Sequence, residues 1–114
     1  MAFQIARVYE PPEDDGAARV LVDRLWPRGV AKADAHVDRW LKDVGPSAEL
    51  RTWFGHDPAK FEEFARRYRA ELDANPAVEQ LRNLEREHGT VTLVYSAKDT
   101  EHNQAVVLRD YLTG

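Results

Sequence analysis

The sequence predicts an α/β fold in a single compact domain over residues 1–114, with a small central sheet of about three strands covered by four to five helices. Three observations predict this class. Residues 3–9 and 18–23 have the apolar pattern of strands, and residues 90–97 are nearly continuous apolar and β-branched, as in a strand covered on both faces. The intervening and final segments carry apolar residues at helical spacing. The predicted order is β–β–α–α–α–α–β–α.

Residues 3–9, "FQIARVY", alternate apolar and polar side chains loosely and are expected to form the first strand. Residues 10–16, "EPPEDDG", form a loop rich in proline and acidic residues, and the second strand then ends near Asp23. The linker between the two strands is short for a parallel crossover. We therefore expect an antiparallel hairpin, with a parallel pair joined by an open loop as the alternative.

The segment "KADAHVDRWLKDVG", residues 32–45, has apolar side chains at spacings of three, one and three, which predicts a helix that ends at Gly45. Pro46 and Ser47 then begin a short helix, "AELRTWF", which ends at Gly55. The apolar positions of the first of these helices are Val37, Trp40, Leu41 and Val44.

Two longer amphipathic helices are predicted next. Asp57 can cap the first, with Pro58 in the first helical turn, and the pair Asn75 and Pro76 separates it from the second, which ends at Gly89. Their apolar faces are Phe61, Phe64, Ala65, Tyr68 and Leu72 in one helix, and Val78, Leu81 and Leu84 in the other.

The strand at 90–97 is the best candidate for the centre of the sheet, and a last helix follows it with Asp99 or Thr100 as its cap. Tyr111 and Leu112, together with Val106 or Val107, are expected to dock this helix on the sheet.

Composition limits the class of protein. Hydrophobic residues make up 43% and charged residues 32% of the chain, as in ordinary soluble domains. No apolar run approaches the roughly 18 residues of a membrane span, and the segment "MAFQIARVYE" lacks the pattern of a signal peptide. The absence of cysteine excludes disulfides, thiolate nucleophiles and cysteine–zinc sites. We expect a cytoplasmic protein that does not bind membranes.

Charge and motifs limit its partners. The net charge of −4 disfavours nucleic acid, because duplex binding relies on many lysine and arginine contacts to phosphates. The sequence has no glycine-rich phosphate loop, no GxSxG and no HExxH. We expect no cofactor. Close metal-ligand spacing is missing among the four histidines, which are His36, His56, His88 and His102. We therefore expect no metal site, with a site assembled from distant residues as the alternative.

The first candidate for chemistry is the stretch "DRLWPRG", which follows the second strand. Asp23, Arg24 and Arg28 lie within six residues, on a path stiffened by Trp26 and the proline after it. Arginine presents a planar fork of donors that matches phosphate or carboxylate. The alternative is structural, with Asp23 pairing with an arginine to lock the loop and Trp26 filling the core.

The second candidate is "SAKDTEHN", which leaves the central strand and enters the last helix. Ligands of open α/β sheets bind beyond the carboxyl ends of strands, near helix N-termini. Lys98 would add a positive charge there, and His102 could exchange a proton near neutral pH. The alternative is ordinary helix capping by Asp99 or Thr100, with the histidine in solvent.

The two loops would meet at one edge if the second and last strands run parallel. We then expect a pocket for a small anion, with His56 as a weaker addition if it points toward the loops and as an ordinary loop residue if it does not. The expected anion ligands are Arg24, Arg28 and Lys98. The expected proton-handling residues are His102, Asp99 and Asp23. The expected pocket wall is Trp26, His56, Ser96 and Asn103.

Four stretches, "RVYEPPEDDGAARVLVDRLWPRG", "DRWLKDVGPSAELRTWFGHDP", "FARRYRAEL" and "VTLVYSAKDTEHNQAVVLRDYL", resemble the YeaO-like family of small bacterial proteins, catalogued as a domain of unknown function. The resemblance covers about residues 6–112 and implies a compact cytoplasmic α/β domain, with no reaction attached. Larger relatives carry cysteines where this chain has Ser96 and Asn103, so the resemblance implies no thiol chemistry here. Some relatives have transcription-regulator labels, but this sequence shows no helix-turn-helix with a basic recognition helix.

The leading hypothesis is an anion-binding pocket at the edge of the sheet, with a hydrolase or transferase of a small phosphorylated or carboxylated molecule as its enzymatic form. The alternative is a non-catalytic regulatory or interaction module, in which the tryptophans and the acidic loop contact a protein. A nucleic-acid binder is the third hypothesis. The oligomeric state stays open.

Overall fold

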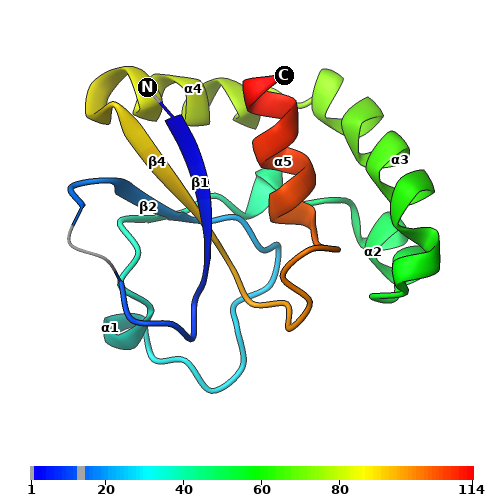
Figure 1. Cartoon of the computed structure of the whole chain (residues 1–114), viewed down its shortest axis with the longest axis horizontal. Helices are drawn as coiled ribbons and strands as arrows, with labels where there is room; N and C mark the ends of the chain where they lie inside the picture. The colour runs from blue at the N-terminus through cyan, green and yellow to red at the C-terminus, as the bar shows by residue number, and fades with distance from the viewer. Residues whose placement is uncertain (1, 13–14) are drawn as a thin grey trace.

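The computed structural model describes residues 2–12 and 15–114, so two residues of the predicted acidic loop, 13 and 14, lie outside the described residues. The described chain forms an α/β domain around one four-stranded sheet, with the strand order β1–β4–β2–β3 (Figure 1). The fold class is confirmed, although the sheet has four strands where about three were expected. The strands are β1 (Ala2–Arg7), β2 (Ala18–Leu21), β3 (Arg39–Trp40) and β4 (Thr90–Tyr95).

All strand pairs are parallel, which corrects the expected hairpin. β1 and β2 do not pair with each other, because β4 lies between them and pairs with both, in the registers Ala2 to Thr90 and Ala18 to Val91. Nearly every residue of β4 is buried, so its backbone groups need strand partners on both sides. The linker after β1 therefore returns to the opposite end of the sheet, as the open-loop alternative requires (Figure 1).

The helix predicted over residues 32–45 is wrong beyond its first turn, which forms the short helix α1 (Lys32–Ala35). Arg39 and Trp40 form an edge strand parallel to β2, followed by a 3-10 turn over Lys42–Val44. The N–H of residue 41 donates to the carbonyl of Leu21 at 3.0 Å, and Arg19 exchanges hydrogen bonds with Asp38. The outer edge of β2 would otherwise leave its backbone groups without partners, and this need overrides the helical spacing of the apolar residues.

The helices follow their capping signals closely. Ser47 accepts a hydrogen bond from the N–H of Leu50, and Asp57 accepts one from Ala59. The last helix begins later than expected, because Asn103 rather than Asp99 or Thr100 is its cap. The helices are α1 (Lys32–Ala35), α2 (Ala48–Phe54), α3 (Phe61–Asp73), α4 (Ala77–His88) and α5 (Gln104–Thr113).

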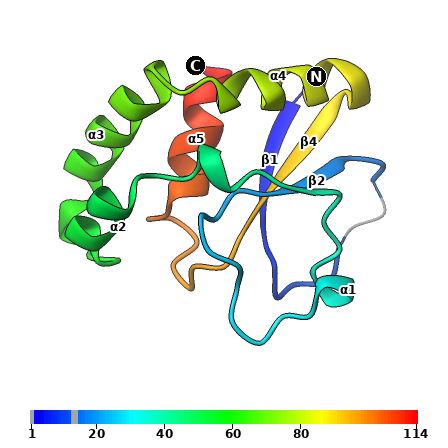
Figure 2. The same cartoon turned by 180° about the vertical axis from the view of Figure 1, so that it is seen from behind.

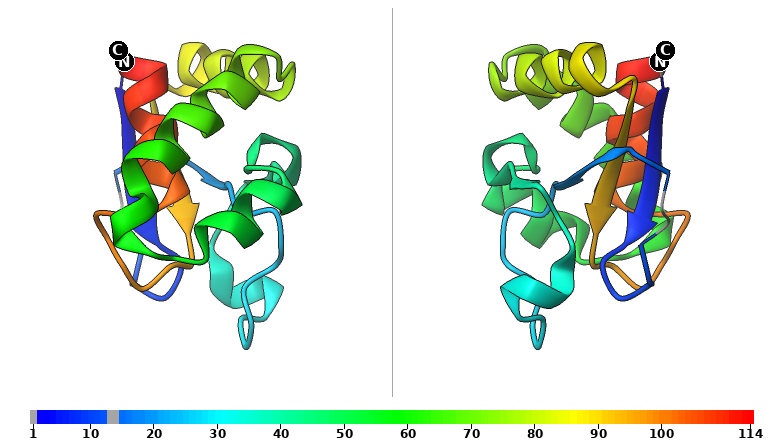
Figure 3. Two further views of the ribbon diagram at one scale, coloured as in Figure 1. Left: turned by 90° about the vertical axis from the view of Figure 1, so that its right-hand side faces the viewer. Right: turned by 90° about the vertical axis from the view of Figure 1, so that its left-hand side faces the viewer.

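The sheet buries apolar side chains on both faces. The main cluster joins alternate residues of β2 and β4 to α3, α4 and α5, and the smaller one includes Leu21, Ala35 and Val94 on the other face, where α1 and the loop after β2 lie (Figure 3). α4 crosses the end of the sheet where the strands begin, so the loops at their carboxyl ends lie at the far end of the molecule (Figure 2). Within the described chain, every helix is too short or too polar to span a bilayer.

The hydroxyl of Tyr68 anchors α3 to the chain before α2. It is fully buried and donates to the carbonyl of Val44 at 2.6 Å. Tyr68→Phe should lower the free energy of unfolding by about 1–3 kcal/mol, because a buried carbonyl loses its partner. Urea denaturation measures this loss. Tyr111→Phe is the matched control, since its hydroxyl donates to Asp73 at an exposed site. Equally small losses of unfolding free energy in both variants would show that the Tyr68 hydroxyl does not stabilise the fold.

Candidate functional site

The loops that follow β2 and β4 leave the same edge of the sheet, because these two strands are parallel. A cavity of about 460 Å³ opens between them and α2. Its charged and polar lining comes from both loops and from the α2 region, and includes Asp23, Arg24, Arg28, Arg51, His56 and Ser96. The parallel arrangement on which the predicted meeting of the loops depends is therefore present.

Asp23 ties the two loops together. Its side chain is buried, and Oδ2 accepts hydrogen bonds from the backbone N–H of Ser96 at 3.0 Å and from the Ser96 hydroxyl at 2.5 Å. Oδ1 accepts a further bond from the amide of Gln104 on α5. Burial raises the pKa of Asp23 above its ordinary value, against the opposing effect of these hydrogen bonds. With both oxygens engaged, Asp23 serves mainly to position its neighbours.

Arg24 fixes the approach to α2. Its Nε donates to the carbonyl of Pro46 at 2.9 Å, and Nη2 donates to the carbonyl of Gly45 at 2.8 Å. The contact is close, since a Cβ at position 45 would lie 3.1 Å from the backbone nitrogen of Arg24. Two of the five N–H donors of this guanidinium are therefore occupied by the protein itself. The loop is locked through backbone carbonyls rather than through an Asp23–arginine pair.

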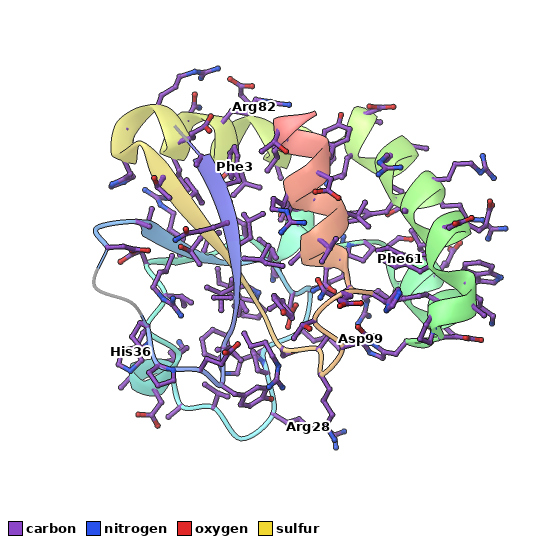
Figure 4. All side chains as sticks on the ribbon, viewed as in Figure 1. Phe3, Arg28, His36, Phe61, Arg82 and Asp99 are labelled. Atoms are coloured by element: carbon purple, nitrogen blue, oxygen red, sulfur yellow. The ribbon has the colours of Figure 1, made fainter. Side chains whose placement is uncertain are left out.

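Arg28 and Arg51 also contribute guanidinium groups to the cavity lining. Arg28 is exposed, and its guanidinium has no hydrogen bond to the part of the chain that the structure describes. Figure 4 shows it at the end of the molecule where the carboxyl-edge loops lie, the end that also carries Asp99. Arg51 lies on α2, and its Nε is buried without a hydrogen-bond partner among residues 2–12 and 15–114. A buried donor without a partner is destabilising and rare in native proteins.

His56 lines the same cavity from the turn after α2. Its backbone has a φ of 57°, in the left-handed region that a residue other than glycine adopts at an energetic cost. Gly55 before it, with a φ of 55°, ends α2. Strained residues of this kind concentrate at functional sites. From the sequence, His56 is expected in the pocket only if it lies near the two loops, and His56 lines the cavity between them.

The other predicted proton-handling residues, Asp99 and His102, lie in the turn before α5, outside the cavity lining. The backbone N–H groups of Glu101 and His102 hold the pKa of Asp99 below its ordinary value. Nδ1 of His102 lies 2.9 Å from Oδ2 of Asp99, and the ring packs edge-on against Phe61. Asp99 therefore holds the turn before α5 through these contacts, while the cap of the helix itself is Asn103.

Three further candidates also lie outside the lining. Lys98 is exposed on the loop after β4. Trp26 donates from Nε1 to the carbonyl of Val30 at 2.6 Å and packs edge-on against Trp40. Asn103 is buried and caps α5. Of the predicted pocket wall, the cavity thus includes His56 and Ser96.

Arg51 and Gln104 were missed by sequence reasoning. Each lies on a helix whose neighbouring residues follow the apolar pattern of the core, so neither stands out by type or spacing. The signal that could have pointed to Arg51 is its position just before "WFGHDP", one turn from the helix end. No group of three or more histidine, aspartate or glutamate side chains among the described residues is placed to hold a metal ion.

Comparison with known proteins identifies relatives over the whole chain. The Uncharacterized protein Rv3073c of Mycobacterium tuberculosis is 45% identical over 111 residues, which cover 97% of this chain and 93% of the relative. The Uncharacterized protein YeaO of Escherichia coli K12 is 42% identical over 113 residues, covering 98% and 97%. No solved structure matches the chain. The family model described as the inactive DUF488-N3 subclade matches residues 2–114. The chain therefore belongs to this DUF488-N3i family and is a YeaO-like domain of unknown function, as its sequence blocks implied.

Proposed function

We propose that this protein binds a small anionic molecule in the cavity at the carboxyl edge of its sheet. The observation that carries the proposal is the buried Nε of Arg51, which faces no described hydrogen-bond acceptor although its residue lines the cavity. A carboxylate or phosphate oxygen supplies the acceptor that this donor lacks. Arg28, on the facing loop, provides a second guanidinium without a described partner.

The charges of the lining support an anion. Three arginines against one aspartate, Asp23, give the described lining a formal charge of 3 − 1 = +2 with His56 neutral. The whole chain has a net charge of −4, so the cavity is a local exception on an acidic protein. A concave site with low-dielectric walls concentrates field lines and raises the local concentration of oppositely charged ligands.

Binding without turnover fits the contacts better than a hydrolase or transferase. Both oxygens of Asp23 already accept hydrogen bonds, and His102 lies outside the lining, which leaves His56 as the cavity residue suited to proton exchange. The matching family model describes its subclade as inactive. The competing function is an interaction module in which the arginines are purely structural. In that module Arg51 stabilises the fold, whereas in an anion-binding site it binds the ligand.

Arg28→Ala should weaken sulfate and phosphate binding by about 10- to 100-fold, the loss expected for a charge-assisted hydrogen bond of roughly 1.5–3 kcal/mol. Isothermal titration calorimetry measures the affinities. Arg69→Ala is the matched control, because it removes the same charge from an exposed site on α3. Equal affinities in wild type and Arg28→Ala, or equal losses in both variants, would contradict the proposal.

Arg51→Met should bind sulfate at least about tenfold more weakly, yet unfold in anion-free buffer with a free energy about 1 kcal/mol higher than wild type. Removing the buried donor relieves its desolvation, while the methionine stem keeps the packing of the arginine stem. Urea denaturation with and without sulfate measures both effects. A structural arginine predicts the opposite result, a variant less stable than wild type in every buffer.

Sulfate affinity should increase as the pH falls from 7 toward 4, because sulfate stays a dianion while Asp23 loses its charge. Burial raises the pKa of Asp23 above its ordinary value, so this carboxylate takes up its proton at a higher pH than an exposed aspartate does. Asp23→Asn should show a smaller increase, since the carboxyl group that takes up the proton is absent. Calorimetry at several pH values measures the difference, and identical pH profiles would show that Asp23 does not affect the site.

A further inference from the structure

The cavity has an apolar side as well as a charged one. Phe54 and Phe64 contribute to its lining, with exposed fractions of 5% and 1%, and their rings stack with centroids 4.2 Å apart. Pro46 and Ala97 add further apolar surface. Because these residues belong to the main core cluster or adjoin the Arg24 contact, the apolar side is a rigid part of the fold.

Leu25 extends this apolar side to the mouth of the cavity. Its exposed fraction of 63% is the highest among the large hydrophobic residues that the structure describes as exposed. The residue lies between Arg24 and Arg28 in the chain, so an apolar group and an anion-binding group come from the same loop. A single exposed leucine is ordinary on a protein surface, but this one lines a cavity whose interior is partly aromatic.

The size of the cavity gives an independent observation. A volume of about 460 Å³ lies within the range of roughly 300–1,000 Å³ that is typical of organic ligand sites. A sulfate or phosphate ion would occupy a small part of it and leave the aromatic side in contact with water. The charged and apolar surfaces together therefore match a ligand with two chemically different parts.

We propose that the natural ligand is a small organic anion with an aromatic or branched aliphatic body, such as an aryl or alkyl carboxylate or phosphate ester. Its anionic group binds Arg51 and Arg28, and its body packs against Leu25, Phe54 and Pro46. This inference rests on the proposed function, and it adds the chemical class of the ligand. It excludes the free inorganic ion and strongly hydrophilic anions as the preferred occupants.

The test compares matched pairs of ligands by calorimetry on the full chain. Phenyl phosphate should bind about 10- to 100-fold more tightly than inorganic phosphate, and phenylacetate should exceed acetate by a similar factor, because a buried ring contributes roughly 1.5–3 kcal/mol. The two pairs separate phosphate from carboxylate as the preferred head group. Equal affinities within both pairs would overturn the inference and leave the proposed function intact.

Two variants locate the two parts of the ligand. Leu25→Ser should reduce the preference for phenyl phosphate by at least about threefold while leaving the affinity for inorganic phosphate unchanged, since the leucine is exposed and carries no charge. Arg28→Ala should weaken both ligands equally. An unchanged preference in Leu25→Ser would remove the apolar mouth from the proposal. No binding of any of the four ligands to wild type would overturn the proposed function itself.

Discussion

Asp23 accepts hydrogen bonds from Ser96 and from Gln104, 81 residues away in the chain, while the next residue, Arg24, donates to two carbonyls just before α2. These two adjacent side chains join the ends of β2 and β4, the start of α5 and the approach to α2. The walls of the cavity come from these same segments. Its shape therefore depends on one dipeptide whose charges are satisfied by hydrogen bonds rather than by each other.

The same region carries destabilising features that packing alone does not require. The Nε of Arg51 is buried without a described acceptor, and His56 holds a left-handed backbone conformation. Asp23 is buried as well, and its pKa is raised. Folded proteins tolerate such departures mainly where a site needs them. A ligand-binding site explains why these three features lie around one cavity, whereas separate local causes for each feature do not.

Elements encoded by local signals could be predicted from the sequence, whereas those encoded by remote partners could not. The cap at Ser47 and the stop at Gly55 define α2 within a few residues, and the buried pattern of β4 gives the central strand. The edge strand at Arg39–Trp40 exists because β2 needs backbone partners, which no local pattern records. The parallel pairing of β1 has the same origin, since each residue of β1 pairs with a residue of β4 that lies 88 positions later in the chain.

The stretch "DRLWPRG" could be recognised as a candidate site because its residue types are unusual after a strand, but its two arginines have different environments. Arg24 is engaged with the carbonyls of Gly45 and Pro46, while Arg28 is exposed without a described partner. A double substitution would therefore remove a structural contact and a candidate ligand contact together, and loss of binding would not distinguish them. Single variants of Arg28 and Arg51 avoid this ambiguity, because neither guanidinium makes a hydrogen bond between the loops in the described chain.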